Sequence, residues 1–430
     1  MKRFITLSLL LSCVCMVACG GNTVTNDQNT PSPITPTRAP EENNKYIEAM
    51  KDMKNEYSDY INYREYLWKT NKKITEDKEL KVLFFGGSLT VGHGASDKEV
   101  FSWRAKACDW FTKNFPDVNF EFINRAVGES GTFLGTYRLQ LDVIEPAPDL
   151  IFLEYAINDK YFKSTYDETA SRCETIIREV RNALPDTEII VLITSDIGCF
   201  GLNKEGKLHI QGQAHEDIAA AYNISTLHIG RLIAKESGFS TDVFRSDYAI
   251  DIVHPNDAGY AIYYNCVEEY LENSLKNTDF SKVEKKEPEK IPQICKSLFD
   301  GNRTHIQPTF ELLESSEALG GSGVVFEERA YTANSYSNGV YKMSGTEDVF
   351  AFSFTGTEVA MWCTLKNKEY LVSVDGAEYV VQTTTEHAPA VIVKNLESKE
   401  HVIKIKLADD GTSMTIGSIF TRDDSLATKK

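Results

Sequence analysis

The sequence predicts two folded units: an α/β domain with a flavodoxin-like parallel sheet, and after it an all-β, jelly-roll-like sandwich. From Leu80 onward, short apolar runs alternate with segments of helical periodicity, which is typical of a parallel sheet with helices on both faces. After about residue 309, short alternating stretches punctuated by Gly, Asn and Asp replace this pattern, as in β-sandwiches. The 430 residues also exceed the usual size of a single core.

Composition divides the chain into six segments. They are a signal peptide at 1–18, a flexible tether at 19–44, a lead-in helix at 45–79, the α/β domain at 80–276, a linker or strap at 277–308, and the β-sandwich at 309–424. The linker is charged and interrupted by Pro288 and Pro292. No internal repeat relates the two folded units.

The first segment has the pattern of a secretory signal peptide. Lys2 and Arg3 precede the apolar run FITLSLLLSCVCMV, and small residues follow it in VACGG. The stretch MVACG resembles the lipobox of bacterial lipoproteins, in which the cysteine, here Cys19, carries the lipid and becomes the mature N-terminus. A plain secretory signal is the alternative. No later apolar run could span a bilayer, so an outward-facing lipoprotein anchored only by its lipid is expected.

The residues between the anchor and the first predicted strand divide into two parts. Residues 20–44 are rich in Thr, Pro and Asn with almost nothing to bury, which indicates a flexible tether. The next residues place apolar and aromatic side chains at helical spacing, which predicts a helix packed on the main domain. These side chains are Ile47, Met50, Met53, Tyr57, Tyr60 and Ile61.

Five buried strands and six helices are expected in the α/β domain. The strands are LKVLFF, VNFEFINRAV, DLIFLEYAIN, TEIIVLITS and ISTLHIG. The helices are expected at 101–115, 137–144, 165–183, 213–222, 229–236 and 256–275. The sandwich is expected to hold seven or eight strands and no helices.

Charge and cysteine usage exclude several classes of protein. The formal net charge of −17 disfavours nucleic acid and anionic lipid surfaces as partners. Beyond Cys19 six cysteines are scattered without a C-x-x-C pair, which argues against zinc ribbons and redox motifs. Free thiols in the core are the favoured interpretation and a disulfide is the alternative. The six are Cys108, Cys173, Cys199, Cys266, Cys295 and Cys363.

Four short motifs follow the predicted strands, where ligands of parallel α/β sheets gather. Ser88 follows the first strand after two glycines, Gly128 ends the second, and Asn158 lies just beyond the third. His254 stands three residues after Asp251, close enough for the carboxylate to orient the imidazole ring. Considered alone, Ser88 would be interpreted as a helix N-cap and Asn158 as a turn or capping residue.

Together these motifs resemble the four blocks of the SGNH, or GDSL-type, hydrolase family over about residues 80–275. The first block reads GGSLT, so Gly87 stands where the family often has aspartate, and the third reads AIND, with Ala156 where glycine is common. The resemblance implies that Ser88 attacks an ester carbonyl, His254 accepts its proton and Asp251 orients the ring. It also implies an oxyanion hole made by the backbone N–H groups of Ser88 and Gly128 and the Asn158 side chain, with no metal or cofactor.

An exported hydrolase with an appended sandwich looks like esterases that remove acetyl groups from polysaccharides. An SGNH lipase or thioesterase acting on acyl chains, and a non-enzymatic surface glycan-binding lipoprotein, are the alternatives. Several aromatic side chains are candidates for glycan contacts, with core packing as the alternative for each: Trp103, Tyr155, Tyr331, Tyr336, Tyr341 and Trp362. The sequence does not decide which glycan is recognised or which acetyl position is cleaved. It also does not decide whether acetyl groups are hydrolysed or transferred, or what the oligomeric state is.

Overall fold

The computed structural model describes residues 48–50, 52–285, 287, 290–296, 299, 301–328, 339–364, 368–384 and 390–424. The predicted signal peptide, Cys19 and the tether lie outside the described residues. Within the described part of the chain, no helix is both long enough and apolar enough to cross a membrane.

A six-stranded sheet of order β1-β6-β5-β4-β2-β3 forms the centre of the first domain. Strands β2 to β6 run parallel, and β1 is an antiparallel edge strand beside β6. Among the parallel strands, numbered along the chain, the order is 2-1-3-4-5, the flavodoxin-like arrangement that the sequence predicts. The bounds are Ile61–Asn62, Glu79–Gly86, Asn119–Asn124, Leu150–Glu154, Glu188–Leu192 and Ser225–Leu227 for β1 to β6.

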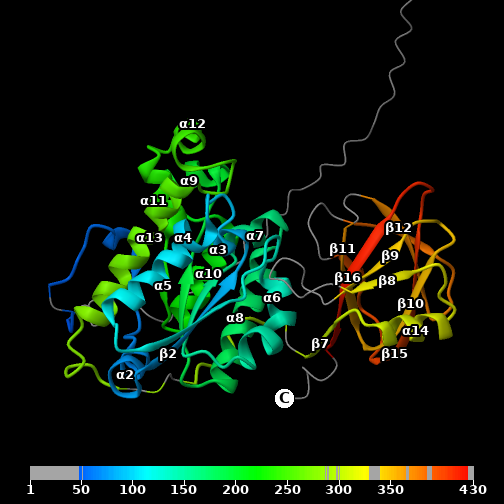
Figure 1. The fold of residues 1–430 in the computed structure, drawn as a ribbon, viewed down its shortest axis with the longest axis horizontal. Helices are drawn as coiled ribbons and strands as arrows, with labels where there is room; N and C mark the ends of the chain where they lie inside the picture. The colour runs from blue at the N-terminus through cyan, green and yellow to red at the C-terminus, as the bar shows by residue number, and fades with distance from the viewer. Residues whose placement is uncertain are drawn as a thin grey trace, which may run out of the picture. The chain divides into compact units, whose positions relative to one another are not determined.

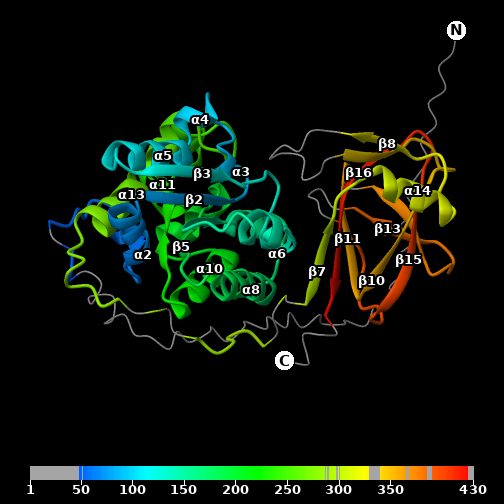
Figure 2. The ribbon, with the colours of Figure 1, turned by 60° about the horizontal axis from the view of Figure 1, so that its bottom comes forward.

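Helices cover both faces of this sheet, as Figure 1 and Figure 2 show. Val82 and Phe84 of β2 pack on one face with α5, α11 and α13, while Leu83 and Phe85 pack on the other with α8 and α10. Both sets are buried, which explains why the strand is a continuous apolar run instead of an alternating one. The principal helices are α5 Trp103–Asn114, α6 Thr132–Leu139, α7 Ala156–Tyr161, α8 Tyr166–Ala183, α10 Ile210–Ala221, α11 Ile229–Glu236 and α13 Asp257–Leu271.

Shorter helical segments connect these elements. They are α2 Trp68–Lys72, α3 Ser88–Val91, α4 Lys98–Phe101, α9 Phe200–Lys204 and α12 Thr241–Val243. Five-residue π-helical turns occur at Lys73–Asp77, Gln140–Ile144, Phe244–Tyr248 and Glu272–Lys276, and short 3-10 turns at Ser58–Tyr60 and Ile197–Cys199.

The single lead-in helix predicted for residues 45–79 is wrong for the part that the structure describes. Met50 forms an isolated bridge with Thr278, and the backbone N–H of Tyr57 donates to the Glu269 carboxylate. Long-range bonds to α13 and the residues after it therefore satisfy this backbone. Its apolar side chains pack on the finished core without forming a continuous helix.

The second domain is an antiparallel sandwich of two sheets, with orders β10-β15-β12-β13 and β14-β11-β16-β9-β8, and β7 paired to β16. Alternate residues of facing strands, such as Phe350, Phe352, Ile403 and Ile405, fill its core. The bounds of β7 to β16 are Asn302–Ile306, Val325–Glu328, Gly339–Met343, Val349–Gly356, Glu358–Cys363, Glu369–Val374, Val380–Thr383, Ala390–Val393, Lys399–Leu407 and Met414–Asp423.

Two details of this half differ from the prediction. Helix α14, Phe310–Ala318, was expected to be absent; the Thr309 side chain caps it by accepting from Leu312 N. Strand β7 falls within the range predicted as a linker, and five of its residues pair with β16. The six cysteines are all free thiols, four of them buried.

Candidate active site

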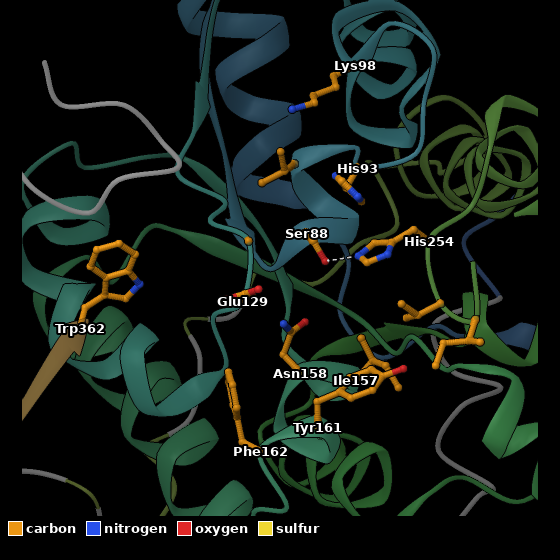
Figure 3. Close-up of a pocket in the computed structure, with 14 residues that line it drawn as sticks. Ser88, His93, Lys98, Glu129, Ile157, Asn158, Tyr161, Phe162, His254 and Trp362 are labelled. Atoms are coloured by element: carbon orange, nitrogen blue, oxygen red, sulfur yellow. Dashed lines mark hydrogen bonds between the residues drawn. The ribbon is translucent and has the colours of Figure 1, made fainter. Parts of the chain in front are cut away.

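The carboxyl ends of three neighbouring strands bring predicted site residues together. Ser88 follows β2, Gly128 follows β3, and Asn158 lies in the first turn of α7 after β4. Strand β2 lies between β3 and β4, so this is the point where the strand order reverses and where ligands of such sheets bind. Figure 3 shows Ser88, Asn158 and His254 around one pocket, which Gly128 also lines.

A sharp turn places Ser88 at the end of β2. Gly86 is required there because a Cβ at this position would lie 2.7 Å from the carbonyl oxygen of Glu154. The helix that follows the turn is only the single turn of α3, which ends at Gly92 in the left-handed region at φ 91°. The turn leaves the Ser88 side chain facing the pocket (Figure 3).

Ser88, His254 and Asp251 form a continuous hydrogen-bond chain. Ser88 Oγ lies 2.8 Å from Nε2 of His254, and Nδ1 of the same ring lies 2.7 Å from Oδ2 of Asp251. With a proton on Nδ1, the ring donates to the carboxylate and presents its Nε2 lone pair to the serine hydroxyl. This is the geometry in which an imidazole can accept the hydroxyl proton.

Asp251 is held ionised by its surroundings. Its second oxygen, Oδ1, accepts from the backbone N–H groups of Val253 at 2.8 Å and His254 at 2.7 Å. Partial burial opposes ionisation, but these bonds and the His254 ring lower the pKa of Asp251 below its ordinary value. The loop itself is closed by a bond from Ile250 N to the His254 carbonyl, 2.9 Å long.

Gly128 and Asn158 flank the serine where an oxyanion would form. A Cβ on Gly128 would come within 4.0 Å of the Ser88 Cβ, so the backbone of this glycine approaches the serine closely. The Asn158 side chain is largely buried, and its amide points toward Ser88 (Figure 3). A Cβ on Gly87 would clash with Asn158 Oδ1. Glycine at this position therefore leaves the space that the Asn158 side chain occupies in this chain.

A buried carboxyl group that the sequence analysis did not single out lies beneath the turn. Glu154, at the end of β4, accepts from Thr194 Oγ1 at 2.8 Å, Thr90 Oγ1 at 3.0 Å and Gly87 N at 3.3 Å. Burial raises its pKa more than these bonds lower it, to about 7. Its position at the end of an apolar run gave no separate signal in the sequence.

The pocket has a volume of about 490 Å³, which is within the usual range for small-molecule sites. Trp362, a candidate for glycan contact in the sequence, also lines it. The other lining side chains were not assigned to the site from the sequence: Val91, His93, Lys98, Glu129, Ile157, Tyr161, Phe162, Ile252 and Val253. Most belong to the loops and helix starts after β2, β3 and β4 or to the Asp251–His254 loop; Trp362 comes from β11.

The aromatic candidates separate into two groups. Trp103, Tyr155 and Tyr341 are fully buried, so these three pack in the core and cannot contact a glycan. Trp362 is partly exposed and lines the pocket. Tyr331 and Tyr336 lie outside the described residues. Across the described ranges, no group of three or more His, Cys, Asp or Glu residues is arranged to hold a metal ion.

The fold and the hydrogen-bond chain define an α/β domain whose pocket is suited to acyl transfer. Residues 84–262 match the family described as GDSL-like Lipase/Acylhydrolase. This region is therefore a GDSL-type hydrolase domain, and the chain is a carboxylic ester hydrolase. A search of curated protein sequences finds no match.

Two solved structures share the two-domain fold. One is a two-domain esterase, CEX, active on acetylated mannans, at 19% identity, with a TM-score of 0.65 over 86% of this chain and 98% of that one. The other is the same esterase co-crystallised with mannopentaose, at 20% identity, with the same TM-score and coverage. At these identities the likeness establishes the architecture: a GDSL-type domain followed by an all-β domain.

Proposed function

We propose that this chain removes O-acetyl groups from a polysaccharide or oligosaccharide, with Ser88 as nucleophile, His254 as general base and Asp251 as the residue that orients it. One observation carries the proposal: the Ser88–His254–Asp251 hydrogen-bond chain opens into a pocket that also contains Gly128 and Asn158. A serine hydroxyl is a weak nucleophile at neutral pH, and an adjacent oriented imidazole supplies the base that it needs.

In the first half-reaction Ser88 Oγ attacks the acetyl carbonyl carbon while its proton passes to His254 Nε2. The backbone N–H groups of Ser88 and Gly128 and the Asn158 amide donate to the carbonyl oxygen as it becomes negative. The tetrahedral intermediate collapses with cleavage of the bond to the sugar oxygen. That oxygen leaves as a hydroxyl group because His254 returns the proton to it, and Ser88 is left acetylated.

In the second half-reaction water replaces the sugar. His254 accepts a proton from the water as its oxygen attacks the acetyl carbonyl, and the same three donors stabilise the second oxyanion. Collapse breaks the bond to Ser88 Oγ, which regains its proton from His254, and acetate leaves. No step requires an oxidant, a metal or an organic cofactor.

The acetylated-glycan substrate is supported by architecture. CEX, which shares both domains with this chain, is active on acetylated mannans. The pocket also has one aromatic side chain, Trp362, that comes from the sandwich. Aromatic rings in such positions offer a flat apolar surface to a bound ligand. The sandwich would then contribute to substrate binding as well as to structure.

Acetate release from acetylated mannan and acetylated xylan, measured for the unmodified protein and Ser88→Ala, tests the proposal. We expect release from at least one glycan and its loss in Ser88→Ala. Acetyl and octanoyl p-nitrophenyl esters are compared in parallel. A preference for octanoyl would replace the acetylesterase by an acyl-chain lipase or thioesterase, and undiminished acetate release by Ser88→Ala would refute the mechanism.

We also propose that the enzyme is an outward-facing lipoprotein attached through Cys19. The proposal rests on the sequence MVACG and on the polar residues that follow it. Radiolabelled palmitate should be incorporated into the unmodified chain and not into Cys19→Ala. Equal labelling of both chains would exclude Cys19 as the anchor.

A further inference from the structure

The two elements that carry the proposed oxyanion donors are joined by a buried carboxylate. Asp159 follows Asn158 in the first turn of α7, and its side chain is completely buried. Its Oδ1 accepts from the backbone N–H of Thr132 at 2.8 Å, and the Thr132 hydroxyl lies 2.9 Å from Oδ1 and 3.0 Å from Oδ2. Thr132 is the first residue of α6 and ends the loop that begins at Gly128.

A buried histidine completes this arrangement from a third element. Nε2 of His215, in α10, lies 3.0 Å from Asp159 Oδ2, and both side chains are fully buried. Burial alone would lower the pKa of His215, but Cys173 and the Asp159 carboxylate raise it to about 10. These contacts favour the protonated ring opposite Asp159, and such a partner offsets the cost of burying the carboxylate.

The loop between Gly128 and Thr132 fits tightly against this carboxylate. A Cβ on Gly131 would clash with Asp159 Oδ1, so no side chain separates the loop from Asp159. The Ser130 hydroxyl donates to the Val127 carbonyl at 2.7 Å, which closes the turn from within. The loop therefore has little freedom to move relative to the first turn of α7.

We propose that Asp159, with His215 as its counter-ion, is a positioning residue that fixes Asn158 and the Gly128 loop relative to each other, so that both donors meet the same carbonyl oxygen. The inference rests on the proposed function, because it assigns a role to Asp159 in that reaction. Misplacing catalytic groups by about 1 Å costs on the order of 100-fold in rate. A residue that never touches substrate can therefore change the rate by this much when it displaces a catalytic group.

Asp159→Asn tests the inference because it preserves size and one acceptor but removes the charge opposite His215. With p-nitrophenyl acetate we expect kcat to fall about 10- to 100-fold, with KM within about twofold of the unmodified value. The displaced donors, Asn158 and Gly128, would stabilise the carbonyl oxygen only in the transition state, so their loss lowers kcat and not substrate binding. Inactivation by a p-nitrophenyl methylphosphonate, whose tetrahedral adduct places an oxygen in the oxyanion hole, should slow in parallel.

Asp217→Asn is the matched control. Asp217 lies two residues after His215 on α10, is largely buried, and accepts from Tyr166 OH at 2.7 Å and Gln213 Nε2 at 2.8 Å. These two bonds link Asp217 to α8 and to its own helix α10, and not to α7 or the Gly128 loop. We therefore expect kcat to stay within about twofold even if the melting temperature falls. If both variants lose kcat in proportion to stability, Asp159 is merely structural and the inference is overturned.

A double-mutant cycle separates this inference from the proposed function. Asn158→Ala alone should lower kcat about 100-fold or more, and adding Asp159→Asn should cost at least threefold less than it does in the unmodified enzyme. If the two substitutions lower kcat by fully multiplicative factors, the inference about Asp159 is overturned, but the assignment of the oxyanion hole still stands. An unchanged kcat in Asn158→Ala would refute the oxyanion assignment itself.

Thr132→Val provides a second variant if Asp159→Asn fails to fold. This substitution removes the Thr132 hydroxyl, which contacts both oxygens of the Asp159 carboxylate, and keeps the hydrogen bond from the Thr132 backbone N–H to Asp159 Oδ1. We expect kcat to fall about three- to tenfold with little change in KM. An unchanged kcat in folded Thr132→Val, together with failure of Asp159→Asn to fold, would also count against the inference.

Discussion

The ring of His93 lies edge-on to the ring of His254, with centroids 4.5 Å apart and planes inclined by 73°. The His93 ring lines the pocket, and its backbone N–H donates to the Ser88 carbonyl at 3.0 Å, while the Ser88 hydroxyl contacts the His254 ring. Burial and the neighbouring His254 both lower the pKa of His93. His93 is therefore neutral at neutral pH and leaves His254 free to become charged during the reaction.

This contact predicts opposite outcomes for two substitutions. His93→Phe keeps a flat ring, so kcat/KM should stay within about threefold of the unmodified enzyme. His93→Lys adds a permanent positive charge near His254, so kcat/KM should fall about tenfold or more. Because a nearby positive charge lowers the pKa of an imidazole, the acidic limb of the pH–rate profile should also move to lower pH. Identical profiles for the two variants would contradict this reading.

The close approach of Gly87 and Asn158 predicts the effect of a single methyl group. Gly87→Ala would place its Cβ against Asn158 Oδ1, so the amide must move away from the oxyanion position. We expect kcat with p-nitrophenyl acetate to fall about 100-fold, close to the effect of Asn158→Ala. Gly201→Ala is the control, because a Cβ there meets nothing within 4 Å. Wild-type kcat in Gly87→Ala would show that the site tolerates the displacement.

Much of this architecture could be predicted from the sequence, because its determinants are local. The run Val82–Phe85 indicates a strand buried on both faces, and the three-residue spacing of Asp251 and His254 allows their contact within one loop. Glu154 was not predicted, because its role depends on Gly87, which lies far away in the sequence and adjacent in space. Sequence spacing likewise cannot reveal which strand ends meet.

The errors have the same origin. Residues 45–61 show helical spacing of apolar side chains, but bonds such as that from Tyr57 N to Glu269 satisfy the backbone in another conformation. Tertiary packing thus overrides a local preference. For Trp362 the sequence left two alternatives open, glycan contact and core packing, because a core position and a pocket position give the same pattern on an alternating strand. Only the three-dimensional neighbours of the Trp362 side chain show which of the two positions it occupies.

Trp362→Ala should separate glycan binding from ester chemistry. If the ring contributes a binding surface, KM for an acetylated glycan should rise about five- to thirtyfold, the range for losing a buried aromatic contact in an interface. The kcat/KM for p-nitrophenyl acetate should change less than twofold. Trp68→Ala is the control, since Trp68 is also partly exposed but does not line the pocket. Equal KM for the glycan in both variants would assign Trp362 a structural role.

Glu188 predicts a pH dependence of stability that is separate from the active site. Its carboxyl group accepts from Lys69 N at 3.0 Å and Thr70 N at 2.8 Å, and burial together with the nearby Glu65 raises its pKa to about 8. Between its unfolded pKa of about 4.3 and this value, the folded state binds more protons than the unfolded state. The free energy of unfolding should therefore decrease as pH rises through this window.

Glu188→Gln should remove this contribution, so its melting temperature should fall less steeply between pH 5 and pH 8 than that of the unmodified protein. The control is Glu205→Gln, because the Glu205 side chain is exposed and forms a surface ion pair with Lys207. Thermal melts of the three proteins at several pH values provide the measurement. Parallel curves for Glu188→Gln and the unmodified protein would show that Glu188 is ionised in the folded state throughout, with the surrounding N–H groups outweighing its burial.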